Sequence, residues 1–309
     1  MINLNDKRSK IVIAGGTGAL GKLLADFYVA MGWMVIVLTR SAWSSVPAIR
    51  YVTWDGKTLD TWADELTGAA AVVNLAGRSI NTRFTANRKQ EILDSRIDST
   101  AVIGEAISIC KSPPKVWINA GGIAIFGSSS ALKTEADVPD GTDFLSLVSR
   151  QWEQVFSASM TPATRKIQLR ISSVLLSGRG ILSPLVKLTK LGLGGTVGSG
   201  NQYVSWIHNQ DFVKLVDWLI VNETIVGIVH ASSPNPVTNR DFMQALRKKL
   251  RIPFGIRNPT WSTKLGAWLI GTQPELALLG HRVVSGVLGD KGFVFDFPEL
   301  PAALRNLML

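Results

Sequence analysis

The sequence predicts an α/β protein in which a doubly wound parallel sheet is followed by a smaller C-terminal α/β lobe. Two observations predict this class. Short apolar runs rich in β-branched residues alternate with longer helical patterns through the first half of the chain. In the second half the alternation is less regular, and a glycine-dense stretch interrupts it. Strands joined by helices favour right-handed crossovers, and therefore a parallel sheet with helices on both faces.

The first unit of this pattern is a strand, a turn, a helix and a second strand. Lys10–Ala14 is predicted as a buried strand because β-branched residues fill it. Apolar residues then recur at helical spacing from Leu20, and the helix is expected to end near Gly32. Met34–Leu38 is predicted as the second strand.

The turn, Gly15-Gly-Thr-Gly-Ala-Leu-Gly21, has the glycine spacing of a Rossmann-type dinucleotide-binding crossover. One glycine allows the sharp turn, another lets a pyrophosphate approach the backbone, and the last allows close packing of helix and strand. The helix N-terminus then offers N–H groups and a partial positive charge to the pyrophosphate. The turn residues expected to bind the cofactor are Gly15, Thr17, Gly18, Ala19, Leu20 and Gly21.

The end of the second strand indicates which dinucleotide binds. An NAD site places an acid there to accept from the ribose 2′-hydroxyl, whereas this chain has Arg40 and Ser41 and no acid. Arg40 can pair with a 2′-phosphate through charge-assisted hydrogen bonds, so NADP (NADPH) is expected rather than NAD. The alternative interpretation is a solvated arginine at a strand end.

The later strands are expected to supply the rest of the site. They are Tyr51–Trp54, Ala69–Ala76, Lys115–Ala120 and Lys166–Leu176, with helices over Leu59–Leu66, Thr85–Cys110 and Phe144–Phe156 and a surface loop over Ser128–Gly141. Ligands of such sheets lie at the carboxyl ends of the strands. Further cofactor contacts are therefore expected from Leu75, Ala76, Gly77, Asn119, Ala120, Gly121, Ser172 and Ser173. Small residues such as the two serines are also ordinary in a sheet.

The second half is predicted to form most of a substrate-facing lobe. Helices are expected over Ile181–Leu191, Gln210–Val221 with Asn209 as N-cap, Thr238–Leu250, Pro259–Leu288 (one or two helices) and Glu299–Met308, with strands over Tyr203–Ile207 and Val226–His230. The glycine-dense stretch from Gly192 to Gly200 follows no strand, so it is not counted as a second phosphate cradle. The predicted domains are 1–177, with contributions from about 203–231, for NADP binding, and 178–309 for the substrate.

Composition limits the class of protein. With 309 residues and 46% hydrophobic residues the chain is globular. The net charge of +10 raises nucleic acid or an anionic membrane surface as partners. Most of the basic residues are scattered, and the tight run from Arg247 to Arg251 lies on a helical pattern, where a solvated face is the simpler interpretation. We therefore expect a small-molecule substrate, no nucleic-acid partner, no membrane partner and a monomer or homodimer.

Cys110 is the only cysteine, which excludes an intramolecular disulfide and a cysteine-built zinc site; no metal is expected. The N-terminal residues are too polar for the apolar core of a secretory signal, and the apolar stretches are too short to span a bilayer. These features predict a cytoplasmic protein.

The residues also resemble a known family. Ala14–Gly21, Asn74–Gly77 and the strand ending in Asn119-Ala120 are similar to the extended short-chain dehydrogenase/reductases. More narrowly, the chain resembles an atypical branch of epimerase-like proteins, often labelled NAD-dependent epimerase/dehydratase or cell-division-inhibitor-like. That match is carried by Ser95-Arg-Ile97, Asp143-Phe-Leu, Trp152-Glu153, Leu191–Gly195, Gly198–Tyr203, Trp206-Ile-His208, Asp211, Gly280-His-Arg282 and Gly292–Phe295. The resemblance implies a Rossmann domain, a small substrate lobe and a nicotinamide dinucleotide, in its phosphorylated form.

The chain departs from the wider family where protons are moved. Typical members use a Tyr-x-x-x-Lys pair, in which the lysine lowers the tyrosine pKa, and a nearby Ser or Thr. Phe144–Val148 occupies that helix here and has neither tyrosine nor lysine. The narrower branch carries serine, threonine and tyrosine after the fifth strand instead, and in this chain Asn119–Gly127 has none of them.

A few polar groups remain as candidates for catalysis and substrate binding. Tyr203 and His208 are the candidate acid–base groups, although each also fits a role in the core. Asp211 either orients His208 or interacts with a helix dipole. Arg96 and Trp206 are the candidate substrate residues; Arg96 alternatively pairs with Asp94 or Asp98 on the surface.

These observations favour an NADP(H)-dependent oxidoreductase or epimerase-like enzyme that acts on a small polar or sugar-like substrate. A second hypothesis belongs to another class: a dinucleotide-binding protein with little catalysis that acts as a redox sensor or partner-binding module. The missing acid–base groups favour the second hypothesis, and the glycine turn supports both.

Overall fold

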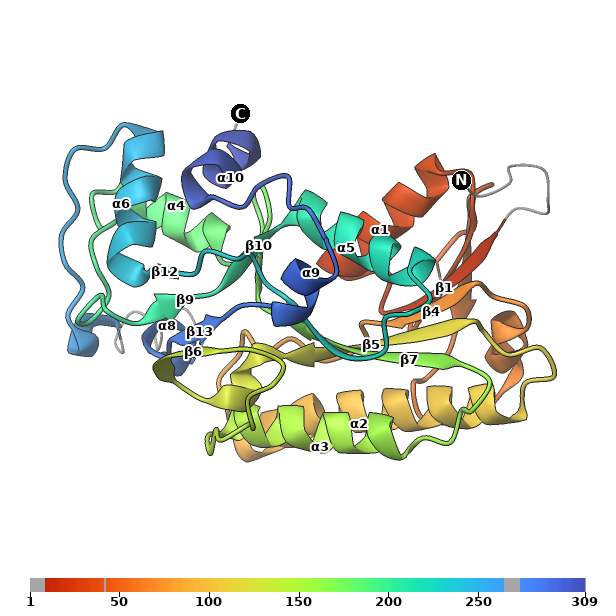
Figure 1. Cartoon of the computed structure of the whole chain (residues 1–309). Helices are drawn as coiled ribbons and strands as arrows, with labels where there is room; N and C mark the ends of the chain where they lie inside the picture. Colours follow the sequence, from red (N-terminus) through yellow and green to blue (C-terminus); the bar gives the residue numbers. More distant parts are fainter. Residues whose placement is uncertain (1–8, 42, 264–272, 309) are drawn as a thin grey trace.

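The computed structural model describes residues 9–41, 43–263 and 273–308, and its centre is a seven-stranded parallel sheet (Figure 1). The strand order is β11-β7-β5-β4-β1-β2-β3. This order confirms the predicted doubly wound class, because the chain moves outward from β1 in both directions. The strands are β1 Lys10–Ala14, β2 Met34–Thr39, β3 Ile49–Thr53, β4 Ala71–Asn74, β5 Val116–Gly122, β7 Arg165–Ile171 and β11 Gly227–Ala231.

Helices cover both faces of the sheet (Figure 1). Helices α1 (Ala19–Ala30) and α5 (Asn209–Val221) pack on one face, and α2 (Ala86–Ile109), α3 (Phe144–Ala158) and the 3₁₀ helix η1 (Thr61–Leu66) pack on the other. Residues of β1 alternate between the two cores: Ile11 and Ile13 face α1, while Val12 and Ala14 face α2. Burial on both faces is why this strand reads as a continuous apolar run.

The single strand predicted over Lys166–Leu176 is wrong, because the chain changes sheets at Ser172. The Ser172 N–H and hydroxyl both donate to the Ala231 carbonyl, at 3.1 and 2.7 Å. Beyond it, β8 (Ser173–Leu175) leaves the main sheet and pairs with β10 (Trp206–His208). The strand predicted over Tyr203–Ile207 is likewise divided, because Ser205 separates β9 (Tyr203–Val204) from β10.

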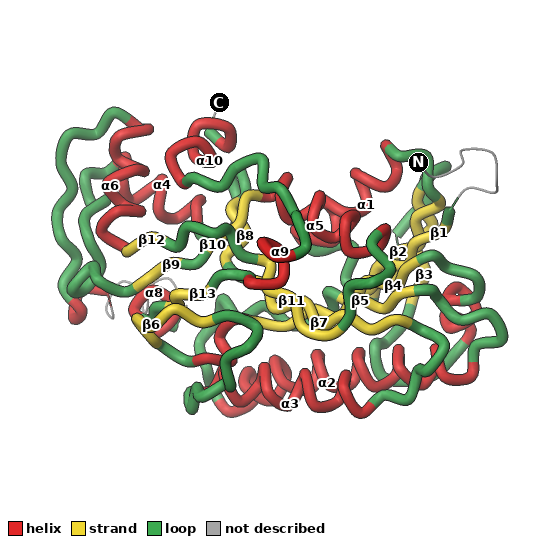
Figure 2. The backbone as a smooth tube through the Cα atoms, viewed as in Figure 1, coloured by secondary structure: helices red, strands yellow, loops and turns green. Residues whose placement is uncertain are grey.

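The second lobe has its own core, formed by three helices (Figure 2). Helices α4 (Leu182–Lys190), α6 (Asn239–Leu250) and α10 (Leu300–Leu307) pack around Trp206. Strand β12 (Val237–Thr238) pairs antiparallel with β9 beside them. Residues after α9 (Gly286–Asp290) return to the first domain, where Phe293 joins the core under α5.

Two predictions of local structure fail where the partners are distant in sequence. The expected loop over Ser128–Gly141 contains β6 (Ser129–Lys133), which pairs with β13 (His281–Val283). The helices expected over Pro259–Leu288 are replaced in part by β13, with short helices α8 (Glu275–Leu278) and α9 (Gly286–Asp290); residues 264–272 lie outside the described part. A pairing across about 150 residues leaves no local periodicity to detect. In the described residues, no helix has the length and apolarity to cross a membrane.

Candidate functional site

The glycine turn lies at the carboxyl end of β1, where each glycine has a separate steric reason. Gly15 has φ +75°, and a Cβ there would lie 2.8 Å from the Leu75 carbonyl carbon and oxygen. A Cβ on Gly21 would lie 2.5 Å from the Gly15 carbonyl oxygen, so this residue allows the helix to pack on the turn. Gly15 is therefore the residue that makes the sharp turn.

The turn presents main-chain donors to solvent. Thr17, Gly18 and Ala19 are exposed, and Gly18 is the N-cap of α1 without a side chain to bind the first N–H groups. The first intrahelical bond of the turn runs from the Lys22 N–H to the Gly18 carbonyl, at 2.8 Å. The N–H groups of residues 19–21 are thus left for an anion, and the first turn has no acidic residue to compete for them.

Beside this turn, the ends of β2 and β4 line a polar cavity of about 380 Å³. It is lined by Arg40, Gly77, Arg78, Ser79, Asn81, Thr82 and Arg88. Glu91 pairs with Arg78 at 3.1 Å and with Arg88 at 2.8 Å. No carboxylate of the described residues lies within 4 Å of Arg40. The cavity therefore has three guanidinium groups and one adjacent carboxylate.

Arg78 and Arg88 were missed by the sequence analysis. Arg78 follows Gly77 directly at the end of β4, and Arg88 and Glu91 are three residues apart in the first turns of α2. Position at the carboxyl end of a strand was the signal that could have found Arg78.

Arg96 supports the loop after β4 that contains Gly77 and Arg78. Its guanidinium donates to the carbonyls of Arg78 (3.1 Å) and Ile92 (2.8 Å) and lies 5.2 Å from the Trp152 ring centre. A Cβ on Gly77 would lie 3.2 Å from its Cζ. Burial lowers the pKa of Arg96 to about 10, so it stays charged at neutral pH. The structure brings Arg96 to the predicted cofactor loop, and the alternative of a surface pair with Asp94 or Asp98 is wrong: Lys57 pairs with Asp98, and Gln90 binds Asp94.

The other predicted loop residues lie around this cavity or beneath it. Ser41 is exposed and Leu75 and Ala76 are half-buried near the turn, whereas Asn119, Ala120 and Gly121 are buried in β5. Asn119 accepts from the Asn74 side chain at 2.8 Å and from the Thr100 hydroxyl at 3.2 Å. The Trp152 indole donates to the same hydroxyl. These amides are satisfied by each other, so they stiffen the strand ends.

A buried ion pair that the sequence analysis missed continues this polar row onto β7. Arg170 binds Glu153 through two hydrogen bonds of 2.7 and 2.8 Å, and its side chain is 3% exposed. It also lies 3.4 Å from His230 Nε2. Glu135 accepts from the main-chain N–H of His230 and from that of Gly286, at 2.8 and 2.9 Å. This arrangement links α3, β7, β11 and α9.

No hydroxyl group replaces the missing acid–base pair at the usual positions. Gly121 lies against the Gln168 amide, with no room for a side chain. On α3, Ser146 is bound to the Ala124 carbonyl and the Asp143 carboxylate, and Ser149 donates to the Leu145 carbonyl. Their hydroxyls are used within the protein.

Tyr203 is half-buried on β9, and the Arg282 guanidinium lies 4.6 Å from its ring centre. Arg282 comes from β13, which contacts η2 (Ile123–Phe126), the segment directly after β5. In the described residues no carboxylate lies within 4 Å of Arg282. Tyr203 is therefore the candidate proton donor that stays accessible and has a cation beside it.

The structure leads us to revise His208. Its side chain is fully buried, stacks on Phe297 at 3.9 Å, and its Nδ1 accepts from the Gln210 N–H as the N-cap of α5. Burial lowers its pKa to about 4. A neutral, enclosed ring has no route to a substrate, so we assign it a structural role; it also takes the capping role that was expected of Asn209.

Asp211 and Trp206 also belong to the interior. Asp211 accepts from the N–H groups of Asp296 (2.7 Å) and Phe297 (3.0 Å), which fastens the C-terminal segment to α5. Trp206 is fully buried in the second core and donates to the Asn235 carbonyl. It therefore supports the lobe rather than facing a substrate.

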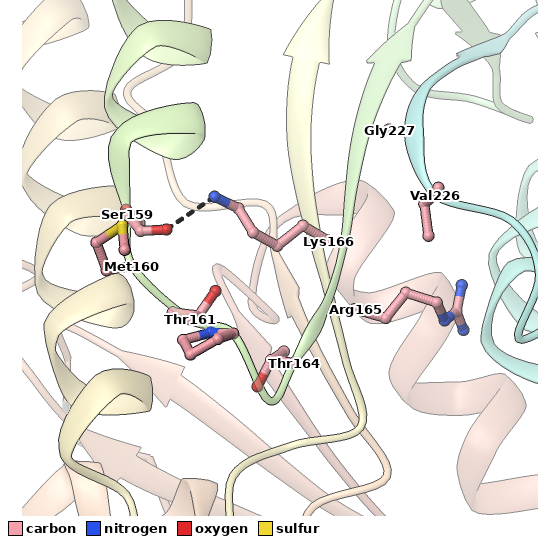
Figure 3. Close-up of a pocket in the computed structure, with 9 residues that line it drawn as sticks. Ser159, Met160, Thr161, Thr164, Arg165, Lys166, Val226 and Gly227 are labelled. Atoms are coloured by element: carbon pink, nitrogen blue, oxygen red, sulfur yellow. Dashed lines mark hydrogen bonds between the residues drawn. The ribbon is translucent and has the colours of Figure 1, made fainter.

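A second hollow, of about 500 Å³, lies at the amino ends of β7 and β11 (Figure 3). Lys166 there donates to the carbonyls of Phe156 and Ser159 at the end of α3, and Arg165 donates to three carbonyls near the end of α5. Both cations are occupied by helix C-termini, so we assign no ligand to it.

Comparison with known proteins agrees with this geometry. Residues 11–228 match the model of the NAD dependent epimerase/dehydratase family, and residues 259–307 match a domain of unknown function, DUF1731. The human epimerase family protein SDR39U1 is 30% identical over 306 residues, which are 97% of this chain and 99% of the human protein. The epimerase family protein YfhF of Bacillus subtilis is 30% identical over 302 residues, covering 96% of this chain and 97% of that protein.

Solved structures give the same result. The crystal structure of human SDR39U1 (isoform 2) with NADPH has a TM-score of 0.86 at 28% identity, covering 96% of this chain and 98% of that chain. A nucleoside-diphosphate sugar epimerase from Corynebacterium glutamicum has a TM-score of 0.77 at 27% identity, covering 96% of this chain and 57% of that chain. The UDP-N-acetylglucosamine 4-epimerase of Bacillus cereus, at 17% identity and a TM-score of 0.74, covers 97% of this chain and 98% of that chain and shares the fold.

Proposed function

This chain belongs to the NAD dependent epimerase/dehydratase family, and we propose that it is an NADP(H)-dependent oxidoreductase or epimerase-like enzyme for a small polar or sugar-like substrate. The observation that carries the proposal is the open turn at β1, with free helix donors, beside a cavity lined by arginines. The structure of the human relative with NADPH supports the proposed cofactor. Proteins of similar fold include enzymes of nucleotide sugars, which supports the proposed class of substrate.

The residues present fit a nicotinamide dinucleotide. The cradle at Gly15 and Gly21 has no space for a Cβ, and the N-terminus of α1 offers main-chain N–H groups to a pyrophosphate. The loop at Gly77, braced by Arg96, closes the other side. When bound, the cofactor supplies the hydride chemistry, and the protein supplies orientation and electrostatics.

The arginine cavity supports the preference for NADP. A phosphate monoester carries about −1.5 to −2 charges at neutral pH. Arg40, Arg78 and Arg88 carry three positive charges, and Glu91 neutralises one of them. The cavity therefore matches a 2′-phosphate in charge. Arg40, which has no carboxylate within 4 Å in the described part of the chain, is the residue proposed to bind it.

Tyr203 is the residue we propose to donate or accept the substrate proton. Arg282 beside it is proposed to hold an anionic group of the substrate, since no carboxylate of the described residues lies within 4 Å of it. The usual positions at β5 and α3 carry Gly121, Phe144 and Val148, which have no side-chain group that moves a proton. The serines of α3, Ser146 and Ser149, are bonded within the protein.

The proposal is tested in two steps. Calorimetric titration of the purified protein with NADPH and with NADH is expected to give tighter binding of NADPH; no heat with either would reject the dinucleotide site. A screen of carbonyl and nucleotide-sugar substrates then follows NADPH oxidation, with Tyr203→Phe as the variant. Loss of turnover in Tyr203→Phe with unchanged NADPH affinity supports the assigned role. Cofactor binding without turnover across the screen would favour the redox-sensor hypothesis, which the internally bonded serines support.

A further inference from the structure

Two segments far apart in sequence lie side by side at the free end of the second lobe. Residues 192–198, after α4, run along residues 254–258, after α6. The Ile256 N–H donates to the Gly192 carbonyl at 2.9 Å, and the Asn258 N–H donates to the Thr196 carbonyl at 2.8 Å. A Cβ on Gly195 would overlap the Ile256 carbonyl, which explains the glycine density of the first segment. Figure 1 shows the loop after α6 at the edge of the molecule, beyond α4.

These two segments, the end of α4 and the residues just after position 258 expose large apolar side chains. We call the group the lobe-tip surface: Leu188, Leu191, Leu193, Phe254, Ile256 and Trp261. Leu191 is 74% exposed and Trp261 69% exposed, and the remaining four are at least 36% exposed. The Phe254 ring packs closely against Gly192: a Cβ on Gly192 would lie 3.2 Å from that ring. Such a concentration of exposed apolar groups is typical of an interaction surface.

Exposed positive charge predominates around the lobe-tip surface. Five cations are exposed nearby: Lys187 and Lys190 on α4, Lys248 on α6, and Arg251 and Arg257 after α6. The sequence has no Asp or Glu from 154 to 210, nor from 242 to 274. None of these five cations has a carboxylate within 4 Å among the residues that the structure describes. The fold therefore adds Lys187 and Lys190 of α4 to the basic run at the end of α6, because the two helices pack against each other.

We propose that the lobe-tip surface docks on an anionic phospholipid membrane. Leucine, isoleucine and aromatic side chains enter the boundary between headgroups and acyl chains, while lysine and arginine remain at the phosphates. The absence of a spanning helix in the described residues fits peripheral binding. This departs from our expectation of no membrane partner, which was based on the sequence spacing of the cations.

The same charge pattern disfavours other occupants. A second copy of the chain would bring two cationic surfaces together, which is repulsive. Nucleic acid would use the cations, but exposed leucine and isoleucine add nothing to phosphate contacts. Both remain measurable outcomes of the test.

The test is co-sedimentation of the full chain with phosphatidylcholine vesicles, with and without phosphatidylglycerol. Binding is expected only with phosphatidylglycerol, and it should weaken as salt is raised. Lys190→Gln with Arg251→Gln should lower the partition coefficient by about 25-fold, or about five-fold for each charge. Leu191→Ser with Ile256→Ser should lower it by at least about ten-fold. Met160→Ser and Lys111→Gln, at exposed positions elsewhere, should bind as the parent does.

Tryptophan fluorescence locates the contact. Anionic vesicles should shift the emission to the blue, and Trp261→Phe should abolish the shift, whereas Trp43→Phe, at a residue that is 55% exposed near β3, should keep it. Equal binding to neutral vesicles, or double variants that bind as the controls do, would overturn the proposal. The proposal also fails if the double variants change only the oligomer mass or only the binding to duplex DNA. Those results would assign the surface to a second copy of the chain or to nucleic acid, respectively.

Discussion

The two halves of the sheet's carboxyl edge are built in opposite ways. At β1, β2 and β4 the edge is open: glycines replace side chains, the N-cap Gly18 has no side chain to bind the first N–H groups of α1, and Arg40 has no carboxylate partner among the residues that the structure describes. At β5, β7 and β11 it is closed, because Asn119, Gln168, Arg170 and His230 are buried and bonded to each other or to neighbouring groups.

This comparison shows which polar groups of the fold are available to bind a ligand. Main-chain donors and unneutralised cations at the open half are free for a ligand, since the protein does not satisfy them. At the closed half Asn119, Gln168, Arg170 and His230 each have a partner within the protein, so these residues hold the strand ends in place instead of binding a ligand. The catalytic groups of the wider family would sit at this closed half, where this chain has Phe144 and Val148 in place of the tyrosine and lysine and Gly121 and Gly122 at the end of β5.

The largest effect is expected at the closed half. Glu153→Ala leaves Arg170 buried without its partner, so we expect the free energy of unfolding to fall by about 3–5 kcal/mol. Urea denaturation measures it. Asp26→Ala, which removes an exposed ion pair with Lys22, should cost less than about 1 kcal/mol. A loss at Glu153 as small as the loss at Asp26 would show that the closed half is not held by its charges.

At the open half, Gly15→Ala should abolish most cofactor binding. The new Cβ would lie 2.8 Å from the Leu75 carbonyl, so the turn must move, and we expect NADPH affinity to fall by at least about 100-fold, or about 2.7 kcal/mol. Gly32→Ala is the matched control, because Gly32 has φ +77° but open space around it. Calorimetry should find normal NADPH affinity in Gly32→Ala. If NADPH affinity falls equally in both variants, the contact of the new Cβ with the Leu75 carbonyl is not the cause of the loss.

A pH series examines His208, the buried N-cap of α5. Its folded pKa of about 4 lies below the usual 6.5, so between these values the unfolded state binds more protons. The free energy of unfolding should therefore fall as the pH falls from about 6.5 to about 4, by about 2–3 kcal/mol from this group. His208→Asn keeps an N-cap side chain and should flatten the decline. An unchanged slope, carried wholly by His230 and His281, whose pKa values burial also lowers, would contradict this.

The smallest effect is expected at Arg40. Removing its charge in Arg40→Ala should weaken NADPH binding by about ten-fold and leave NADH binding unchanged, because only the 2′-phosphate is lost as a partner. Arg50→Ala, at an exposed residue of β3, is the control. If NADH affinity falls as much as NADPH affinity, Arg40 acts on the fold of the loop and not on the phosphate.

The sequence by itself determined the parts of the molecule that local pattern encodes. Strands β1, β2 and β4 and helices α1, α2 and α3 could be predicted, because β-branched runs, helical periodicity and glycine spacing act within a few residues. The glycine turn and Arg40 were found for the same reason, and the structure adds the steric cause of each glycine.

Only the tertiary structure decided what depends on distant partners. The pairing of β6 with β13, the Glu153–Arg170 pair and the cavity shared by Arg40 and Arg78 each join segments that are separated in sequence. Folding also decided the roles of Trp206 and His208, because the burial of a side chain depends on the whole chain and not only on the residues next to it in sequence. The physical reason is that hydrogen bonds, charge pairs and packing depend on distance in space, which the order of residues does not specify.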